Sequence, residues 1–128
     1  MSYVPFTLPF ADELGIHIVS ASATEVVGEL EVRESLCTTG ARMHGGALMS
    51  LADTLGAIGA FLALPEGSTG TTTIESKTNF VGAAKVNTTV TGTTTPVHVG
   101  RRTSIWQTRI TSEDGKLVAV VTQTQLVL

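Results

Sequence analysis

The sequence predicts an α+β fold in which a curved antiparallel sheet wraps around one long helix. Residues 47–64 form an apolar run that is too long for a strand. Residues 71–127 divide instead into four segments rich in Thr and Val, with turn signals between them. A strand pair is predicted before the helix, so the order along the chain is hairpin, helix, sheet. One helix and one antiparallel sheet can bury their apolar faces against each other.

The composition is that of one self-associating domain. The chain has 128 residues without a linker-like stretch, so we expect a single domain over residues 1–128. Hydrophobic residues make up 42% of the chain and charged residues only 15%. This low charged share indicates that further surface is buried by self-association.

The net charge argues against nucleic acid and membrane partners, and the cysteine content bears on the cellular location. The formal net charge of -3 gives no global reason to bind nucleic acid or an anionic membrane, so neither is an expected partner. Cys37 is the only cysteine, and no basic segment precedes an apolar one at the amino terminus. These features favour a reducing, cytoplasmic location.

The amino-terminal part is expected to form a short helix and a hairpin. Pro5–Gly15 mixes apolar and acidic residues, as in a short helix packed on a sheet. Val26–Arg33 alternates between charged and aliphatic residues, which is typical of a half-buried strand. Ile16–Ser20 is its expected hairpin partner.

The apolar run Ala47–Leu64 is predicted to be one helix, buried nearly all round and ended by Pro65. Its length would also suit a membrane span. The charge of Asp53 near the middle and the strands predicted on both sides argue against a span. The small side chains around Gly56 and Gly59 would let a neighbour, either the sheet or a second copy of the helix, approach closely.

Four strands are expected after the helix. Turn signals at Gly82, at Pro96–Gly100 and at Glu113–Gly115 separate them. Trp106 is expected in the core, given the alternation of its strand. The expected strands are Thr71–Phe80, Lys85–Thr95, Arg101–Ser112 and Lys116–Val127.

Asp53 is the only charged residue between Arg42 and Glu66. An ionised carboxylate in apolar surroundings is unfavourable unless it is paired, and such isolation is one way in which proteins prepare a catalytic base or nucleophile. The alternative is a carboxylate on a narrow solvated stripe with Ser50 and Thr54. The helix pattern alone does not choose between these interpretations.

Gly45 and Gly46 open the same helix, where the first amide N–H groups have no partner within the helix and the macrodipole is positive. These amides form a candidate oxyanion hole for negative charge that develops on a carbonyl oxygen. The lack of a Cβ would let a substrate approach the backbone. A tight loop-to-helix turn is the alternative explanation.

The spacing of these two features predicts a dimer. Asp53 follows Gly45 by eight residues, which is about 12 Å along a helix. One carbonyl cannot lie within about 3 Å of both groups when both belong to the same helix. Two antiparallel copies of the helix around a two-fold axis would bring Gly45 of one chain towards Asp53 of the other. We therefore expect a dimer with two equivalent sites.

The segment Met43–Thr54 closely resembles the HGG-x6-D signature of hotdog-fold acyl-CoA thioesterases, in particular the phenylacetic acid degradation type. The resemblance extends over nearly the whole chain, including Thr73 with Glu75 and the Gly-Arg-Arg sequence at 100–102. It implies the hotdog fold, with a curved sheet around a central helix. It also implies thioester hydrolysis without a cofactor or metal.

The resemblance also implies roles for individual residues. Gly45 would supply the amide that polarises the thioester carbonyl, and Asp53 of the facing subunit would attack the carbonyl or activate a water molecule. Thr73 matches a position at which related enzymes carry a hydroxyl that helps to place the water or the carboxylate. An ordinary strand threonine in a Thr-rich run is the alternative for Thr73.

Thr38 departs from the family pattern, because such enzymes usually carry Asn or Gln six residues before the histidine of the signature. An amide both donates and accepts hydrogen bonds, whereas Thr has a single, shorter hydroxyl to hold the carboxylate or the water. This departure puts the rate or the substrate range in doubt.

The three histidines receive different interpretations. A general-base role is open to His44. We favour a supporting role, in which His44 shapes the loop and contacts the carbonyl region. His17 and His98 have no other ligand at metal-binding spacing, so no metal site is predicted.

Further residues are candidates for binding the substrate. Arg101 and Arg102 could hold the CoA diphosphate, because guanidinium groups bind phosphate in a bidentate manner. A solvated hairpin end is the alternative for this pair. Lys77 and Arg42 are further candidates, and Gly46 is expected to contact the substrate beside the oxyanion donor.

Hydrolysis of an aryl- or medium-chain acyl-CoA to the free acid and CoA is the leading hypothesis. A hotdog hydratase or dehydratase is the second, since His44 and Asp53 could move protons at the α and β carbons. The third is a non-catalytic acyl-CoA-binding protein, which Thr38 keeps open. At least a homodimer is expected, and relatives of the resembled type commonly pair dimers into homotetramers.

Overall fold

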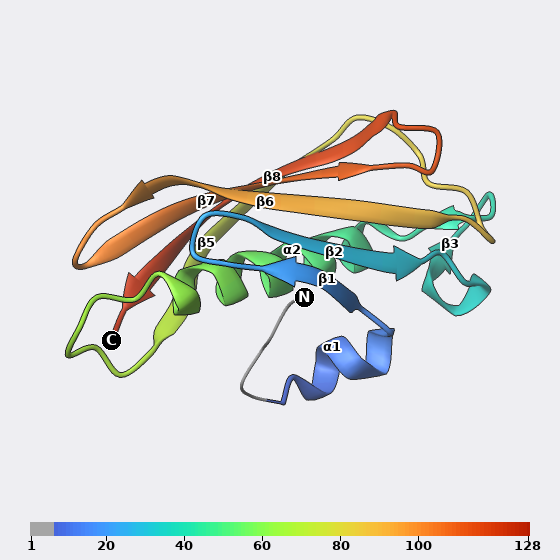
Figure 1. The fold of residues 1–128 in the computed structure, drawn as a ribbon. Coiled ribbons are helices and arrows are strands. Elements are labelled where there is room, and N and C mark those ends of the chain that lie inside the picture. Colours follow the sequence, from blue (N-terminus) through green and yellow to red (C-terminus); the bar gives the residue numbers. More distant parts are fainter. Residues whose placement is uncertain (1–6) are drawn as a thin grey trace.

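The computed structural model describes residues 7–128 as a six-stranded antiparallel sheet that curves around one long helix, α2 (Figure 1). The strands lie in the order β1-β2-β6-β7-β8-β5, and a separate hairpin joins β3 to β4. The helices are α1 (Pro9–Leu14), the 3-10 turn η1 (Glu34–Leu36) and α2 (Gly45–Leu62). The strands are β1 (His17–Ala21), β2 (Val26–Glu31), β3 (Cys37–Thr38), β4 (Arg42–Met43), β5 (Thr71–Phe80), β6 (Thr89–Val99), β7 (Thr103–Thr111) and β8 (Leu117–Val127). The predicted α+β fold is confirmed.

α2 packs into the concave face of the sheet through aliphatic side chains. Leu51 and Leu55 are fully buried, as are their sheet neighbours in the core, Val90, Ile110 and Val121. Each such side chain stabilises the fold by about 1.5–3 kcal/mol relative to full exposure. This contact fixes the position of α2 under the sheet, and with it every functional group that the helix carries.

Two glycines let α2 lie close to large inward-facing side chains of the sheet. A Cβ at Gly59 would lie 2.7 Å from a ring carbon of Trp106, and a Cβ at Gly56 would lie 2.2 Å from Cδ of Gln123. Both Trp106 and Gln123 are fully buried. Of the two neighbours expected at these small residues, the sheet is therefore the one that approaches α2 closely. The prediction that Trp106 lies in the core is confirmed.

One face of α2 is not buried, which corrects the expectation of a helix covered nearly all round. Ser50 and Ala57 are half-buried, and Asp53 and Phe61 are exposed. These residues recur every three or four positions and form a stripe on one side of the helix. α2 is long and apolar enough to cross a membrane, but its opposite face lies in the core of the sheet.

α1 lies beside α2 and is shorter than the predicted helix. It begins at Pro9, since proline suits the first turn of a helix, and it ends at Gly15 with φ of 86°. The predicted residues 5 and 6 lie outside the described part of the chain. Arg33, which follows β2, donates a hydrogen bond to the carbonyl of Leu14 and so ties the end of α1 to the sheet.

β6 differs most from its predicted bounds. It begins at Thr89 and continues through Pro96, where a turn was expected. Pro96 is opposite Trp106 of β7, beyond the last partner that β2 offers, which is Val26 opposite Thr94. In the described part of the chain, β7 alone pairs with this end of β6, and a proline is tolerated at such a position.

Candidate active site

The start of α2 is shaped by His44, the N-cap residue. Its backbone is extended, with φ of -63° and ψ of 137°, and its Nδ1 accepts a hydrogen bond of 2.8 Å from the N–H of Gly46. A ring nitrogen that accepts carries no hydrogen, so the neutral ring would have its hydrogen on Nε2. His44 thus caps the helix and presents an N–H donor at its exposed edge.

The amide of Gly45 is the available donor at this helix start. It donates to no group within residues 7–128, whereas the neighbouring amide of Gly46 is bound to His44. The ring of Phe80 lies against Gly45, because a Cβ there would be 3.0 Å from Cζ of Phe80. The positive end of α2 therefore offers one free N–H group to a carbonyl oxygen.

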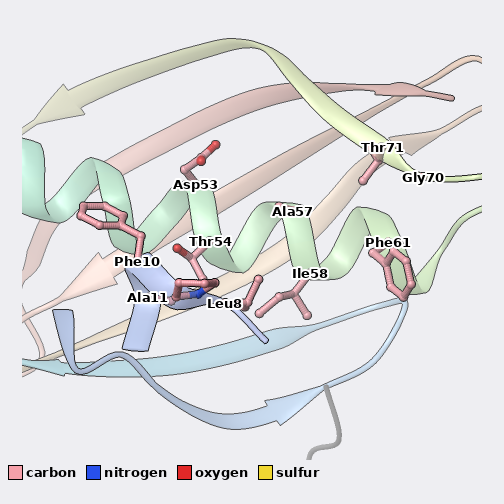
Figure 2. A pocket seen from close by; sticks show the side chains of 11 residues that line it. Leu8, Phe10, Ala11, Asp53, Thr54, Ala57, Ile58, Phe61, Gly70 and Thr71 are labelled. Atoms are coloured by element: carbon pink, nitrogen blue, oxygen red, sulfur yellow. The ribbon is translucent and has the colours of Figure 1, made fainter. Parts of the chain in front are cut away.

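Asp53 lies on the exposed stripe of α2 and points towards β5 (Figure 2). Its Oδ1 accepts a hydrogen bond of 3.0 Å from the hydroxyl of Thr73 and a longer one of 3.5 Å from Nε2 of Gln123. In the single chain, Asp53 therefore lies on a solvated stripe of the helix, which was the second of the two interpretations, and hydrogen bonds hold its carboxylate in place. Thr73 touches it, as the resemblance implied.

A chain of polar groups continues from Thr73 into the sheet. Gln125 on β8 donates through Nε2 to the Thr73 hydroxyl oxygen at 2.6 Å. Thr71 donates in turn to Oε1 of Gln125 at 3.0 Å. Gln123 and Gln125 were missed from the sequence, although the alternation of β8 places both on the inward face among apolar residues. Polar residues at inward positions were the available signal.

A cavity of about 770 Å³ opens beside Asp53, between α1 and α2. Figure 2 shows Leu8 and Phe10 on one side of it, with Ile58 and Phe61 further along α2. Its lining is mostly apolar. The complete lining is Leu8, Pro9, Phe10, Ala11, Asp53, Thr54, Ala57, Ile58, Phe61, Gly70 and Thr71.

Two smaller hollows continue the cavity along α2 towards the start of the helix. One, of about 230 Å³, is lined by Ser50 and Asp53, and the other, of about 240 Å³, is lined by Ser50 and His44. Phe10 lines all three hollows. The exposed face of α2 therefore forms a groove that connects the His44 end with the apolar cavity.

Several predicted residues lie away from this groove within one chain. Thr38 is exposed on β3. Arg101 and Arg102 are exposed in the turn between β6 and β7, at the end of the molecule where α2 finishes (Figure 1). The length of α2, about 27 Å for its 18 residues, separates this end from Gly45.

The other candidates are also peripheral. Lys77 donates to the side chain of Asn79 at 3.0 Å, and Arg42 is exposed on β4. His17 and His98 are exposed on β1 and β6. Across the described residues, no three His, Cys, Asp or Glu side chains gather in a group that could hold a metal ion.

The antiparallel sheet curved around one long helix is the arrangement of the hotdog fold. The thioesterase superfamily model matches residues 40–119, which is more than half of the chain. The chain belongs to this superfamily.

Curated relatives and solved structures agree with that assignment. The chain is 32% identical over 109 residues to a 1,4-dihydroxy-2-naphthoyl-CoA hydrolase of Listeria monocytogenes, with 85% of this chain and 87% of that protein covered. A thioesterase structure from Haemophilus influenzae superposes with a TM-score of 0.86 at 26% identity, over 98% of this chain and 92% of that one. The structure of a mutant of the phenylacetic acid degradation protein PaaI from Thermus thermophilus superposes with a TM-score of 0.85 at 28% identity, and covers 94% of this chain and 100% of that one.

Proposed function

We propose that this chain hydrolyses an aryl- or medium-chain acyl-CoA to the free acid and CoA. The observation that carries the proposal is the Asp53 carboxylate, held by Thr73 at the mouth of an apolar cavity. The free amide of Gly45 on the same helix supplies the second requirement, a donor for the carbonyl oxygen. Thioester hydrolysis needs these two groups on one carbonyl.

The two groups meet only if two chains associate, because eight residues of helix separate them. β5 supports the association, since it is the last strand of the sheet order and its far edge has no partner strand among residues 7–128. Ile74 and Phe80 on this strand are 55% and 52% exposed. A long edge strand presents a row of unpaired N–H and C=O groups that can pair with another copy of itself. We propose a dimer in which β5 and α2 of each chain face their copies in antiparallel fashion.

In this arrangement the Gly45 amide of one chain polarises the thioester carbonyl. Asp53 of the other chain then attacks the carbonyl carbon and expels the CoA thiolate, leaving an anhydride for water to open, or it takes a proton from a water molecule that attacks directly. His44 offers its Nε2 hydrogen near the same carbonyl. Arg101 and Arg102 of one chain come towards the helix start of the other, where the CoA phosphates would lie.

The cavity supports the substrate class. Its volume of about 770 Å³ falls within the range of roughly 300–1,000 Å³ that suits small organic ligands. Its walls are apolar, so they would accept an aromatic ring or an aliphatic chain rather than a charged group. A relative named as a hydrolase of an aromatic acyl-CoA agrees with an aryl substrate.

Thiol release from aryl, medium-chain and long-chain acyl-CoAs tests the proposal, followed with a colorimetric thiol reagent. We expect Asp53→Asn to lower the rate by about a hundredfold or more, since it removes the nucleophile or base. Asp114→Asn, in the turn between β7 and β8, is the matched control and should leave the rate unchanged.

Three other outcomes would contradict the proposal in different ways. Absence of thiol release across the whole panel, with acyl-CoA still bound, would indicate a binding protein. Loss of the ultraviolet absorbance of an enoyl-CoA would indicate a hydratase. Release that survives Asp53→Asn would remove Asp53 from its assigned role and leave the reaction in place.

A further inference from the structure

Gln123 and Gln125 occupy positions where a sheet normally carries apolar residues. Both are fully buried on the concave face of β8, in a strand whose other inward residues include Val121 and Ala119. Two neighbouring buried amides call for a physical explanation, because a buried polar group is unfavourable unless it is hydrogen-bonded.

The buried side-chain amide of Gln123 is unfavourable for the stability of the fold. Its Oε1 is buried and has no hydrogen-bond partner among the described residues. It also needs Gly56 in the middle of α2, since a Cβ there would lie 2.2 Å from both Cδ and Oε1. An interior glycine and an unpaired carbonyl both destabilise a fold. The unpaired carbonyl is not explained by packing, for which an apolar side chain of similar size would serve.

The position of Asp53 explains why a buried side-chain amide is present at Gln123. The Nε2 group of Gln123 faces the Asp53 carboxylate at 3.5 Å, and only this end of the amide can donate to it. The opposite orientation would place two acceptor oxygens together. Gln123 therefore places its N–H donor beneath Asp53, and in this orientation its own carbonyl oxygen has no partner among the described residues.

Gln125 acts on the same carboxylate through Thr73. The Thr73 hydrogen is directed to the Asp53 carboxylate, which can only accept, so the Thr73 oxygen must accept from Nε2 of Gln125 at 2.6 Å. Oε1 of Gln125 then faces the Thr71 hydroxyl at 3.0 Å, whose hydrogen is shared with the carbonyl of Leu126 at 3.0 Å. Thr73 has one hydrogen to donate, and it points to Oδ1 of Asp53 at 3.0 Å. The carboxylate thus sets the direction of the Thr73 hydroxyl, and that hydroxyl sets the direction of the Gln125 amide.

We infer that Gln123 and Gln125 are positioning residues that fix the Asp53 carboxylate from beneath. Both donors converge on Oδ1, so Oδ2 is left as the oxygen that acts on the thioester or on water. Positioning within a few tenths of an ångström is what such a reaction requires. The inference rests on the proposed function for the role of Asp53, whereas the contacts themselves do not depend on it.

Methionine substitutions separate positioning from packing. Gln123→Met and Gln125→Met keep the side-chain length and remove the amide. We expect each to lower kcat for thiol release by about tenfold, with KM within about twofold of wild type. Gln123→Met should also keep or raise Tm, because it removes a buried unpaired carbonyl. Gln107→Met is the matched control, since Gln107 lies on the other face of the sheet and donates to Thr122 at 3.4 Å.

A double-mutant cycle tests whether Gln125 acts through Thr73. In a Thr73→Val background, Gln125→Met should change kcat by less than about twofold, because the group through which it acts is gone. The same four proteins are compared for their free energies of unfolding in urea, where the two substitutions should also be non-additive. Additive effects in the unfolding cycle, or Gln123 and Gln125 variants with wild-type kcat, would overturn the inference.

The two readouts keep the inference separate from the proposed function. If wild type releases no thiol from any acyl-CoA, the proposed function fails, and the unfolding cycle still decides whether Gln125 holds Thr73. If wild type is active and the cycle is additive, the function stands and the positioning role is wrong.

Discussion

At the scale of single residues, the site depends on which atoms of a side chain already take part in a hydrogen bond. His44 shows this most clearly, because its Nδ1 is occupied by the amide of Gly46. The same contact leaves Gly45 as the free donor at the helix start and leaves Nε2 of His44 as an outward-facing donor. A general base would need the ring to accept a proton at the substrate side. The supporting role of His44 stays a prediction, which substitution of this residue tests.

Substitution of His44 separates its capping role from its chemical role. His44→Ala should lower the free energy of unfolding by about 1 kcal/mol, because the N-cap acceptor is lost. His44→Asp should restore that stability, since Asp is among the best N-cap residues. Both variants lack the Nε2 donor, and we expect kcat/KM for thiol release to fall about tenfold in each. A loss of about a thousandfold or more in both would instead assign His44 as the general base.

At the scale of elements, α2 has two faces with different tasks. One face is apolar and fits the sheet at close range, with Gly56 and Gly59 opposite large buried side chains. The other carries Ser50 and Asp53 into a groove. Because both faces belong to one rigid helix, a disturbance of the packed face would move the functional face.

Gly59→Ala tests the packed face. Alanine in a helix interior normally stabilises relative to glycine by about 0.5–1 kcal/mol. Here the new Cβ would lie 2.7 Å from the ring of Trp106, so we expect destabilisation by about 1–3 kcal/mol, measured by urea unfolding. Trp106→Phe in the same chain should recover part of the loss, because the smaller ring leaves room. Gly70→Ala is the control, since a Cβ at Gly70 would have no neighbour within 4 Å. A stabilised Gly59→Ala protein would contradict the close packing.

At the scale of the whole molecule, the chain alone carries half of each proposed site. Gly45 and Asp53 lie on the same helix but about 12 Å apart along α2. The exposed stripe of α2 and the edge of β5, which pairs with no strand of residues 7–128, are the surfaces that a second copy would cover. The low share of charged residues, 15% of the sequence, fits a surface of which part is buried in this way.

Mixed dimers test the shared site. Asp53→Ala removes the carboxylate, and Gly45→Pro removes the amide hydrogen while keeping a residue that suits the first helical position. Each variant alone should be inactive. Refolding them together should restore about a quarter of wild-type thiol release, because half of the dimers are mixed and each has one intact site. Mixed dimers demonstrated by affinity tags but without activity would contradict a site that is shared between chains.

The sequence predicted the α+β fold, the two-strand start and the bounds of β5, because these follow from local periodicity. The wider family resemblance implied a hydroxyl at Thr73 that places the water or the carboxylate, and the structure brings this hydroxyl to Asp53. The sequence missed the continuation of β6 through Pro96, since the tolerance of that proline depends on where a neighbouring strand ends. It also missed Gln123 and Gln125, because alternation shows which face a residue takes but not which helix residue lies opposite.

The chain's own sequence therefore determined its class, its central helix and the two groups on that helix that we propose act on a thioester. Local spacing is sufficient for this, because a helix fixes the separation of its own residues. Only the tertiary structure decided that one face of α2 stays open and which amide of the helix start is free. It also decided which buried side chains of β8 hold Asp53. Each of these depends on contacts between residues far apart in the chain, which the curvature of the sheet around α2 brings together.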